Sequence, residues 1–537
     1  MEKGQRVQIK IEDQTSEGQG VGRSNGLAVF VAGAVVGDLV TAELTKVKKN
    51  YAFGRLVELI EPSKDRIEPM CEYMGSLGQA SGRPESLDGE PLGQAAGRPE
   101  TLDREPLGQA ASRPAQCGGC PYGSLSYEAQ LRVKENQVRE KLSRLGGIAE
   151  PVIRPIIGME QPFRYRNKAT MPIWTGGVIT RKGGILENLG EPAVGFYKGK
   201  SHDVVDCQDC MLQSAPAMAA AEALRQFMKE DNITAYDPKW EKGLMRHLIV
   251  KTAHATGEVM VVLVINGKGI PNVDKLVGML DEAIYNAAER ENGFPAYSLE
   301  SVVVNVHKGK GTAVMGEECV TVAGKPTILE QAGGLVFEVS PLSFYQVNPV
   351  QMEVLYDKAM EYAALTGSET VLDLYCGIGT IGLFAAKAGA AKVIGIESVK
   401  KAVLDANRNA VLNGIVNARY VCGRAEDELP RLMGMQTLDK GTAKDEEDTV
   451  DAGLCVDDVN VVFLDPPRAG CDQRLLEAVV TAAPERIVYV SCDPATLARD
   501  VKYLSEQGYR FEEATPVDMF PWTGHVECVC LMSRVEG

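Results

Sequence analysis

The sequence predicts an α/β domain in the C-terminal part of the chain, an OB-like β-barrel at the N-terminus and an α+β region between them. After about residue 340, the strand patterns TVLDLYC, AKVIGIE, ARYVCG, VNVVFLDPP, RIVYVSCD and the final HVECVCLM alternate with helical segments. Such alternation indicates an open parallel sheet flanked by helices. Residues 1–61 instead alternate apolar and polar side chains between glycine-rich turns, which is typical of a small barrel. A chain of 537 residues is also too long for one compact core.

We divide the chain into four parts on these patterns. An amphipathic helix is expected over 125–148, and strands such as EVMVVLVI and SVVVNVH follow it among further helices. The four parts are the barrel (1–61), a loop containing cysteines (62–124), the central helix and α+β region (125–335) and the α/β domain (336–537).

Two segments are predicted to be insertions. Residues 77–114 repeat with a period of fifteen, as LGQASGRPESLDGEP, LGQAAGRPETLDREP and a truncated third copy. Because the repeat is polar and rich in glycine and proline, it cannot bury much apolar surface, and we expect an inserted loop without fixed structure. Residues 437–458 carry eight Asp/Glu and two Lys and interrupt the α/β alternation, which indicates a second surface insertion.

The charge distribution allows RNA binding only on local faces. A net charge of −16 argues against electrostatic binding of nucleic acid over the whole surface. Residues 151–202, however, carry eight Lys/Arg and three Glu, and a local basic face can engage phosphates. The last hairpin of the barrel mixes basic and aromatic residues, which suits RNA, although a solvated barrel used for protein contacts fits as well. These residues are Lys46, Lys48, Lys49, Tyr51 and Arg55.

The sequence favours a cytoplasmic location. The start of the chain lacks the apolar segment of a signal peptide, and no apolar run approaches the ~20 residues that span a bilayer. No membrane contact and no obligate protein partner are predicted. Thirteen cysteines would be unusual as disulfides in a reducing compartment, so clustered cysteines indicate metal binding or catalysis.

The segment TVLDLYCGIGTIGLF predicts a strand, a tight turn and a helix that together bind a cofactor. Gly377, Gly379 and Gly382 form the pattern GxGxxG, which lets backbone amides and a helix N-terminus approach a ligand closely. Glu397 ends the next strand, where a carboxylate can accept hydrogen bonds from ribose hydroxyls. These features alone also fit a nicotinamide cofactor, or a glycine turn without a ligand.

Two further features favour a methyltransferase that uses S-adenosylmethionine. Asp373 lies near the carboxyl end of the first strand, as methyltransferases of this fold tend to have it. The fourth strand ends in Asp465-Pro466-Pro467-Arg468, which resembles the base-positioning loop of nucleic-acid methyltransferases. Prolines fix φ and therefore stiffen a loop that faces the reacting methyl group.

Cys492 is the candidate nucleophile. It lies in RIVYVSCDPATLARD, at the carboxyl end of a predicted strand and just before a helix. In open α/β sheets that edge binds ligands, and a helix N-terminus can lower the pKa of a thiol. A lone cysteine in a strand is more often merely buried, so the surrounding motifs decide the interpretation.

Five segments together resemble the RNA uracil-5-methyltransferase family, and in particular its 23S ribosomal-RNA 5-methyluridine members, whose N-terminal TRAM domain the barrel resembles. The resemblance therefore covers nearly the whole chain. It implies a class I, Rossmann-like S-adenosylmethionine-dependent methyltransferase domain after the barrel and the central region. The segments are FYQVN (344–348), DLYCGIG (373–379), DPPRAG (465–470), SCDPATLARD (491–500) and DMFPWTGHVE (518–527).

The resemblance also implies roles for individual residues. Cys492 corresponds to the nucleophile and Glu527 to the base. One position departs from the family pattern, because Arg424 stands where relatives usually have an acidic or amide residue near the adenine. Besides Gly377 and Gly379, the implied cofactor contacts are Gln346, Tyr375, Glu397 and Asp465.

The chemistry explains why such a pair is needed. Uracil C5 is a poor nucleophile until a thiolate adds to C6, and a base must then remove the C5 proton so that the cysteine can leave. Glu527 lies among Val526, Cys528 and Val529, and an apolar setting would raise its pKa toward a useful value. The base must also leave any stack to reach the thiol.

Four cysteines are candidate metal ligands. Cys117 and Cys120 form CxxC, and removing residues 75–114 would leave five residues between Cys71 and Cys117. Four thiolates suit an iron–sulfur cluster or zinc equally. The resemblance implies C-x5-C-x2-C with a distant fourth cysteine, Cys210, around a 4Fe–4S cluster, although the neighbouring Cys207 competes with Cys210. The repeat then lies within the cluster loop, which its flexibility permits.

The predicted activity is methylation of C5 of a uridine in 23S ribosomal RNA. The barrel and the four cysteines favour this substrate over transfer RNA, which remains the main enzymatic alternative. An RNA-binding protein with a relict methyltransferase fold is the alternative of another class.

Overall fold

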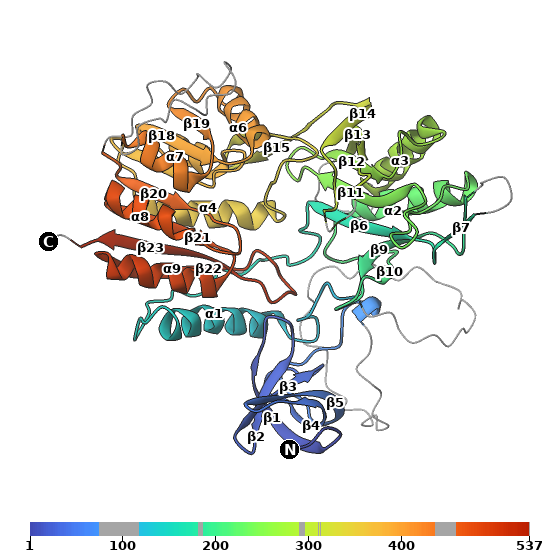
Figure 1. The fold of residues 1–537 in the computed structure, drawn as a ribbon, viewed down its shortest axis with the longest axis horizontal. Coiled ribbons are helices and arrows are strands. Elements are labelled where there is room, and N and C mark those ends of the chain that lie inside the picture. The colour runs from blue at the N-terminus through green and yellow to red at the C-terminus, as the bar shows by residue number, and fades with distance from the viewer. Residues whose placement is uncertain are drawn as a thin grey trace. The chain divides into compact units, whose positions relative to one another are not determined.

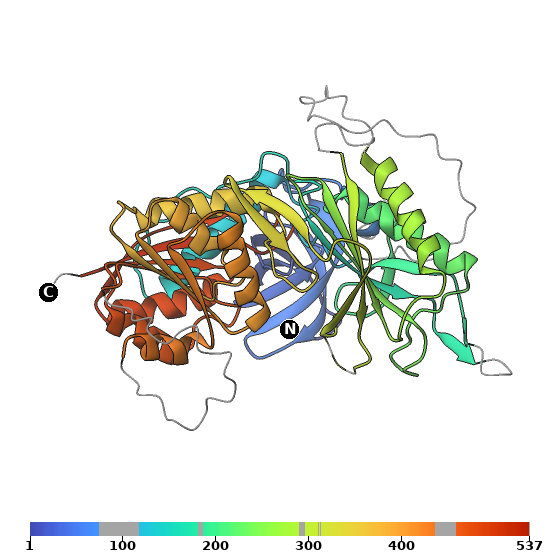
Figure 2. The same ribbon diagram turned by 90° about the horizontal axis from the view of Figure 1, so that it is seen from above.

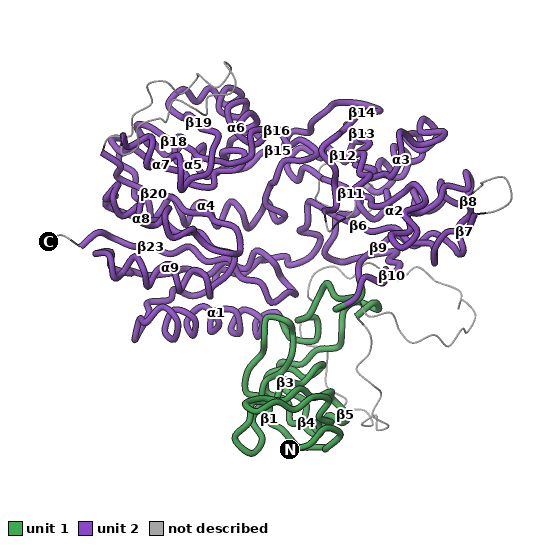
Figure 3. Tube along the Cα trace, viewed as in Figure 1, with its two compact units in different colours: residues 1–126, 198–200 green, residues 127–197, 201–537 purple. Residues whose placement is uncertain are grey.

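The computed structural model describes residues 1–74, 117–180, 186–288, 296–309, 311, 313–434 and 458–535. The predicted repeat insertion, and the acidic segment up to residue 457, lie outside the described residues. The chain forms two compact units (Figure 3). Unit 1 comprises residues 1–126 and 198–200, and unit 2 comprises residues 127–197 and 201–537.

Unit 1 contains the predicted barrel, which is closed by five strands in the order β1-β2-β3-β5-β4. Alternate side chains such as Ile9, Ile11, Val29 and Val31 point inward and are fully buried. A short 3-10 helix, Glu72–Met74, follows the barrel. The strands are β1 (Arg6–Gln14), β2 (Gly20–Ser24), β3 (Leu27–Ala32), β4 (Leu39–Val47) and β5 (Tyr51–Glu61).

The central region of unit 2 is an α+β layer structure (Figures 1 and 2). Its main sheet has the order β10-β9-β6-β11-β12-β13-β14, and the helices α2 and α3 pack against each other and against this sheet. Its elements are β6 (Lys168–Trp174), β7 (Val178–Thr180), β8 (Leu186–Asn188), β9 (Ala193–Tyr197), β10 (Val204–Asp206), α2 (Ala215–Glu230), β11 (Met245–Thr252), β12 (Glu258–Ile265), α3 (Val273–Ala288), β13 (Ser298–Val306) and β14 (Glu318–Gly324). The hairpin of β15 (Ile328–Ala332) and β16 (Leu335–Val339) follows.

The C-terminal domain of unit 2 is the predicted open sheet flanked by helices, and it is doubly wound. The predicted final strand HVECVCLM is antiparallel to its neighbours, not parallel. The strand order is β19-β18-β17-β20-β21-β23-β22, with β17 to β21 parallel and β23 antiparallel to both of its neighbours. Its elements are α4 (Pro349–Ala363), β17 (Thr370–Leu374), α5 (Thr380–Lys387), β18 (Lys392–Glu397), α6 (Lys400–Leu412), β19 (Ala418–Cys422), α7 (Ala425–Leu432), β20 (Val461–Leu464), α8 (Gln473–Ala482), β21 (Arg486–Ser491), α9 (Pro494–Glu506), β22 (Tyr509–Val517) and β23 (Glu527–Arg534).

This strand order positions the site. The chain reverses its direction of winding between β17 and β20, and ligands of open α/β sheets bind at the carboxyl ends of the strands beside such a reversal. The helix α1 (Tyr127–Arg144) packs against α9 and β22 of this domain, although it precedes the central region in sequence. Its Val138 and Leu142 are fully buried in the core that lies on that face of the sheet.

Candidate active site

The turn after β17 has the geometry of a cofactor-binding turn. Gly377 and Gly379 adopt φ of 55° and 81°, and Gly379 caps the N-terminus of α5. A Cβ on Gly379 would lie 2.7 Å from the Tyr420 ring, so only glycine fits there. A Cβ on Gly377 would meet no atom within 4 Å, which leaves space directly above the turn. The sequence at these two glycines therefore creates a backbone cradle with room for a ligand.

Two carboxylates lie beside this cradle. Glu397, at the end of β18, accepts hydrogen bonds from the backbone amides of Gly377 (3.1 Å) and Val399 (2.8 Å). Asp373, in β17, accepts one from the Gly382 amide (2.7 Å), and burial raises the pKa of its carboxyl to about 7. Its other oxygen, Oδ1, is buried without a hydrogen-bond partner among the described residues. A buried carboxylate oxygen that has no partner in the described part of the chain, in the strand that leads into this cradle, fits a site whose ligand supplies hydroxyl or amine donors, as S-adenosylmethionine does.

The other implied cofactor residues surround the same strand end. Gln346 is buried, and its backbone oxygen accepts a hydrogen bond from Asn167 Nδ2 (2.9 Å). Tyr375 directly follows β17 with φ of 66°, and Asp465 directly follows β20. Arg424, the residue that departs from the family pattern, forms a contact within its own segment. Its Nε donates a hydrogen bond to Glu426 (2.7 Å) in the first turn of α7.

Cys492 lies at the carboxyl end of β21, half-buried, as the sequence predicts. The expectation that the helix N-terminus lowers its pKa is wrong. Asp493 caps α9 by accepting hydrogen bonds from the backbone amides of Ala495 (2.8 Å) and Thr496 (3.4 Å). The amides at the positive end of the helix therefore already have a partner. Burial, together with the charges of Glu527 and Asp465, raises the pKa of the Cys492 thiol to about 11.

Glu527 is the first residue of β23 and pairs with Val517, the last residue of β22. Its side chain is 4% exposed, and burial, with a contribution from Asp465, raises the pKa of its carboxyl to about 8. The predicted effect of the apolar setting on this pKa is therefore confirmed. A carboxyl with such a pKa can both lose and hold a proton near neutral pH.

Sequence reasoning did not select Arg468 as a site residue. Its guanidinium lowers the pKa of both Cys492 and Glu527, so it lies near both of these side chains. The DPPR sequence carried the signal, since an arginine directly after a stiff strand end is exposed at the carboxyl edge of the sheet. The structure thus brings together a thiol, two carboxyls with raised pKa and one permanent cation.

The chain is similar in sequence to known RNA methyltransferases. A family model described as tRNA (Uracil-5-)-methyltransferase matches residues 319–535, and a TRAM domain model matches residues 1–57. An uncharacterized RNA methyltransferase from Caldanaerobacter subterraneus subsp. tengcongensis is 40% identical over 532 residues, which cover 99% of each chain. Another from Halalkalibacterium halodurans is 37% identical and covers 98% of this chain and 96% of its own.

The chain belongs to the S-adenosylmethionine-dependent RNA uracil-5-methyltransferase family. The fold of the family is also found in a solved structure, the tRNA (uracil-54, C5)-methyltransferase of Pyrococcus abyssi in complex with S-adenosyl-L-homocysteine. That protein is 24% identical, with a TM-score of 0.66 over 98% of this chain and 100% of its own. As a member of the family the chain is an RNA methyltransferase, and its barrel is a TRAM domain. Among the described residues, no helix has the length and apolar character needed to cross a membrane.

The predicted cluster cysteines are distributed over both units. In unit 1, the amide of Cys117 donates to the backbone oxygen of Tyr73 (2.7 Å), so the two ends of the predicted insertion are joined. The Gly119 amide donates to Cys117 Sγ (3.4 Å). Cys210 belongs to unit 2. Within the described part of the chain, no group of three or more His, Cys, Asp or Glu side chains is arranged to hold a metal ion.

Proposed function

We propose that this family member methylates C5 of a uridine in 23S ribosomal RNA through a covalent adduct between Cys492 and uracil C6. The observation that supports the proposal most is the convergence of Cys492, Glu527, Asp465 and Arg468 on the carboxyl edge of one sheet. A thiol and a carboxyl with raised pKa beside one cation are the groups that addition and later elimination require.

The steps follow from the chemistry of these side chains. The sulfur of Cys492, as thiolate, forms a bond to C6, and the electron pair of the C5–C6 double bond moves toward O4 as an enolate. S-adenosylmethionine, when bound, would supply the methyl group: C5 would bond to the methyl carbon as the bond from that carbon to the sulfonium sulfur breaks, which leaves S-adenosyl-L-homocysteine. Glu527 removes the proton from C5, the double bond re-forms, and the bond between C6 and sulfur breaks to return the thiolate. Arg468 offsets negative charge throughout, since its guanidinium stays protonated.

The raised pKa values of the pair are coupled. The negative charge of Glu527 raises the pKa of Cys492, so protonating or neutralising the carboxyl makes the thiolate easier to form. We therefore expect E527Q to form the adduct and fail to resolve it, because the amide cannot take the C5 proton. C492S should form no adduct. The adduct is detected as protein-bound radiolabelled RNA that survives denaturation.

The decisive experiment uses RNA that contains 5-fluorouracil. That base lacks a removable C5 proton, so the wild-type enzyme should stall as a covalent complex in the presence of S-adenosylmethionine. A wild-type protein that binds the cofactor and yields no complex would favour an RNA-binding protein with a relict methyltransferase fold. Methylation of RNA by C492S at the wild-type rate would exclude the covalent route altogether.

The choice of 23S ribosomal RNA rests on the TRAM barrel and on the cysteines. Transfer RNA is the alternative, and it gains weight because the matching family and the Pyrococcus abyssi enzyme are both named as tRNA methyltransferases. Mapping 5-methyluridine in ribosomal and transfer RNA from cells with and without this protein distinguishes the two. Loss of the modification from transfer RNA alone would contradict the ribosomal assignment.

We also propose that the barrel contacts RNA through an aromatic surface. The rings of Phe30, Tyr51 and Phe53 lie 5.4 to 6.0 Å apart between centroids, and the Tyr51 side chain is 39% exposed. The neighbouring Lys46, Lys48 and Lys49 are exposed. Rings that stack on bases beside cations that attract phosphates are typical of single-stranded RNA binding.

A 4Fe–4S cluster ligated by Cys71, Cys117, Cys120 and Cys210 remains part of the proposal, with zinc as the alternative metal. The hydrogen bond between the two ends of the insertion supports it, because it brings Tyr73, two residues from Cys71, to Cys117. Iron and acid-labile sulfide analysis of anaerobically purified protein tests it. Stoichiometric zinc without sulfide would replace the cluster by a zinc site.

A further inference from the structure

We propose that the connection between β22 and β23, residues 518–526, carries a preformed stacking site for an unpaired nucleotide next to the target uracil. Phe520 and His525 form the site, with Arg166 beside them. This inference rests on the proposed function, since it names a further part of the RNA that the same site would hold.

The side chains have the chemistry of a nucleotide site. The rings of Phe520 and His525 lie 6.0 Å apart between centroids at an angle of 76°, and His525 is exposed. The guanidinium of Arg166 lies 5.9 Å from the Phe520 ring centroid. Bases stack on aromatic rings and on guanidinium planes, and arginine also pairs with phosphate, so the three groups suit one nucleotide.

The stacking site borders the reacting groups. Arg468 Nη2 lies 3.5 Å from His525 Nε2, and the same arginine lies near Cys492 and Glu527. The charged groups that face His525 are Arg468, Lys134, Arg166 and Asp493, three cations and one carboxylate. This excess of positive charge favours a phosphate. A nucleotide held here would be a direct neighbour of a uracil placed at Cys492.

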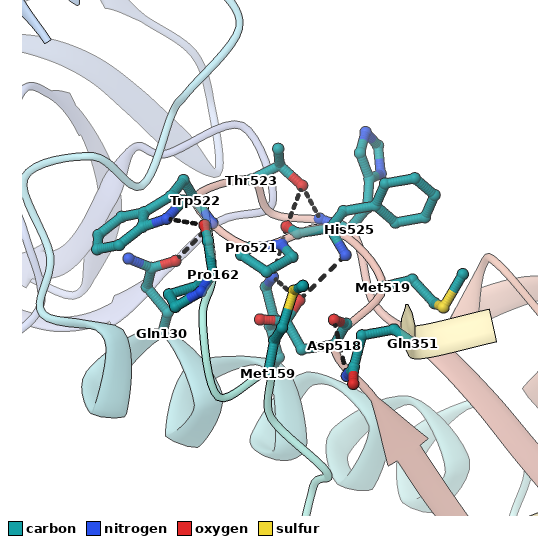
Figure 4. Close-up of polar contacts among 12 residues, drawn as sticks. Gln130, Met159, Pro162, Gln351, Asp518, Met519, Pro521, Trp522, Thr523 and His525 are labelled. Carbon is teal, nitrogen blue, oxygen red and sulfur yellow. Dashed lines mark hydrogen bonds and ion pairs between the residues drawn. The ribbon is translucent and has the colours of Figure 1, made fainter. Parts of the chain in front are cut away.

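The backbone that carries the two rings is fixed from the opposite side (Figure 4). Trp522 has φ of 69°, an uncommon conformation for a bulky residue, and its amide donates to Gln130 Oε1 of α1 (2.9 Å) while its indole Nε1 donates to the Pro162 oxygen (2.8 Å). Lys134 of α1 donates to Asp518 Oδ1 (2.6 Å) and to the Phe520 oxygen (3.0 Å).

Two more elements hold the same connection. Tyr165 donates to the Pro521 oxygen (3.0 Å), and Asn348, at the N-terminus of α4, donates to the Met519 oxygen (3.1 Å). A loop that only joined two strands would need no such set of partners. Because the rings are placed before RNA arrives, little conformational entropy is lost on binding, which is the advantage of a preorganised site.

The test measures RNA affinity without chemistry. Full-length C492S is titrated by fluorescence anisotropy with three single-stranded heptanucleotides: AAAUAAA, the same RNA abasic on the 5′ side of the uridine, and the same RNA abasic on the 3′ side. We expect one of the abasic probes to bind about 10- to 100-fold more weakly than the intact probe. In the background of C492S, F520A/H525A should bind the intact probe as weakly as that abasic probe, and should not distinguish the two.

The controls separate this inference from the proposed function and from folding. Y285A removes an exposed ring from α3 and should leave all three affinities of C492S unchanged. F520L and H525Q retain side-chain bulk and report on the site if F520A/H525A unfolds at a lower temperature. Equal affinity of C492S for the three probes, binding of none of them, or discrimination that persists in F520A/H525A overturns the stacking site. Failure of the wild-type protein to trap 5-fluorouracil RNA, with discrimination intact, removes only the methylation mechanism.

Discussion

The turn after β17 and the connection between β22 and β23 both place non-helical, left-handed residues beside the reaction site, yet different parts of the chain hold them. The first uses Gly377 and Gly379 together with Tyr375, and its Gly379 amide donates to Cys376 O (2.8 Å) only three residues away. The second places Trp522 in the left-handed region and relies on Gln130, 392 positions earlier in the sequence. Contacts between residues that are close in the sequence can be recognised as a short motif. Contacts between residues far apart in the sequence become visible only in the folded structure.

The buried ion pair of Lys134 and Asp518 gives the largest expected effect. Both side chains are 0% exposed, so K134M leaves a buried carboxylate without its cation. We expect this variant to lose about 3–5 kcal/mol of unfolding free energy, measured by urea denaturation. The double variant K134M/D518N removes the remaining charge and should recover most of that loss. K141M, an exposed lysine on the same helix, is the control. If K134M and K141M have the same free energy of unfolding, the ion pair from Lys134 is unimportant for holding the connection between β22 and β23.

A substitution in the glycine turn should lower the free energy of unfolding less than K134M does, and it should weaken cofactor binding more. G379A combines a left-handed residue with a clash against Tyr420, and strain of this kind costs about 1–3 kcal/mol. G414A is the matched control, since Gly414 has φ of 66° and a Cβ there would meet no atom within 4 Å. Calorimetric titration with S-adenosylmethionine should show weakened binding for G379A and unchanged binding for G414A. Equal affinities in the two variants would mean that the clash does not matter.

The features that the sequence predicted and those that it did not differ in the same way, as local contacts differ from distant ones. The glycine turn, the acidic strand ends and the open sheet flanked by helices are encoded in short segments, and all of them were predicted. The partner of α1 was not predicted, because its ion pair joins residues 384 positions apart. The direction of the Cys492 pKa was mistaken for a related reason. The helix N-terminus is visible in the sequence, but the burial of Cys492, and then the approach of Glu527 and Asp465, exist only after folding.

The pH dependence of the elimination step tests whether the surroundings that folding gives to Glu527 also control the proposed chemistry. In the proposed mechanism Glu527 must be deprotonated to take the C5 proton, and burial raises the pKa of its carboxyl to about 8. The rate of product release from a preformed adduct should therefore fall about tenfold per pH unit below about 8 and level off above it. Single-turnover quenching between pH 6 and 9 measures this. A flat profile would show that another group takes the proton.

Q130L should have the smallest effect of these variants. It is also the most sensitive test of the comparison between the turn after β17 and the connection between β22 and β23. It removes the acceptor of the Trp522 amide, and a buried donor left without its partner costs about 1–3 kcal/mol. Because Lys134, Tyr165 and Asn348 still hold the connection, we expect Glu527 to remain in place and the pH profile of elimination to keep its midpoint. A midpoint that moves toward the ordinary range of a carboxyl would mean that the Glu527 side chain has gained water. In that case a single hydrogen bond from α1 sets the environment of the base, and the connection is less redundant than its number of partners indicates.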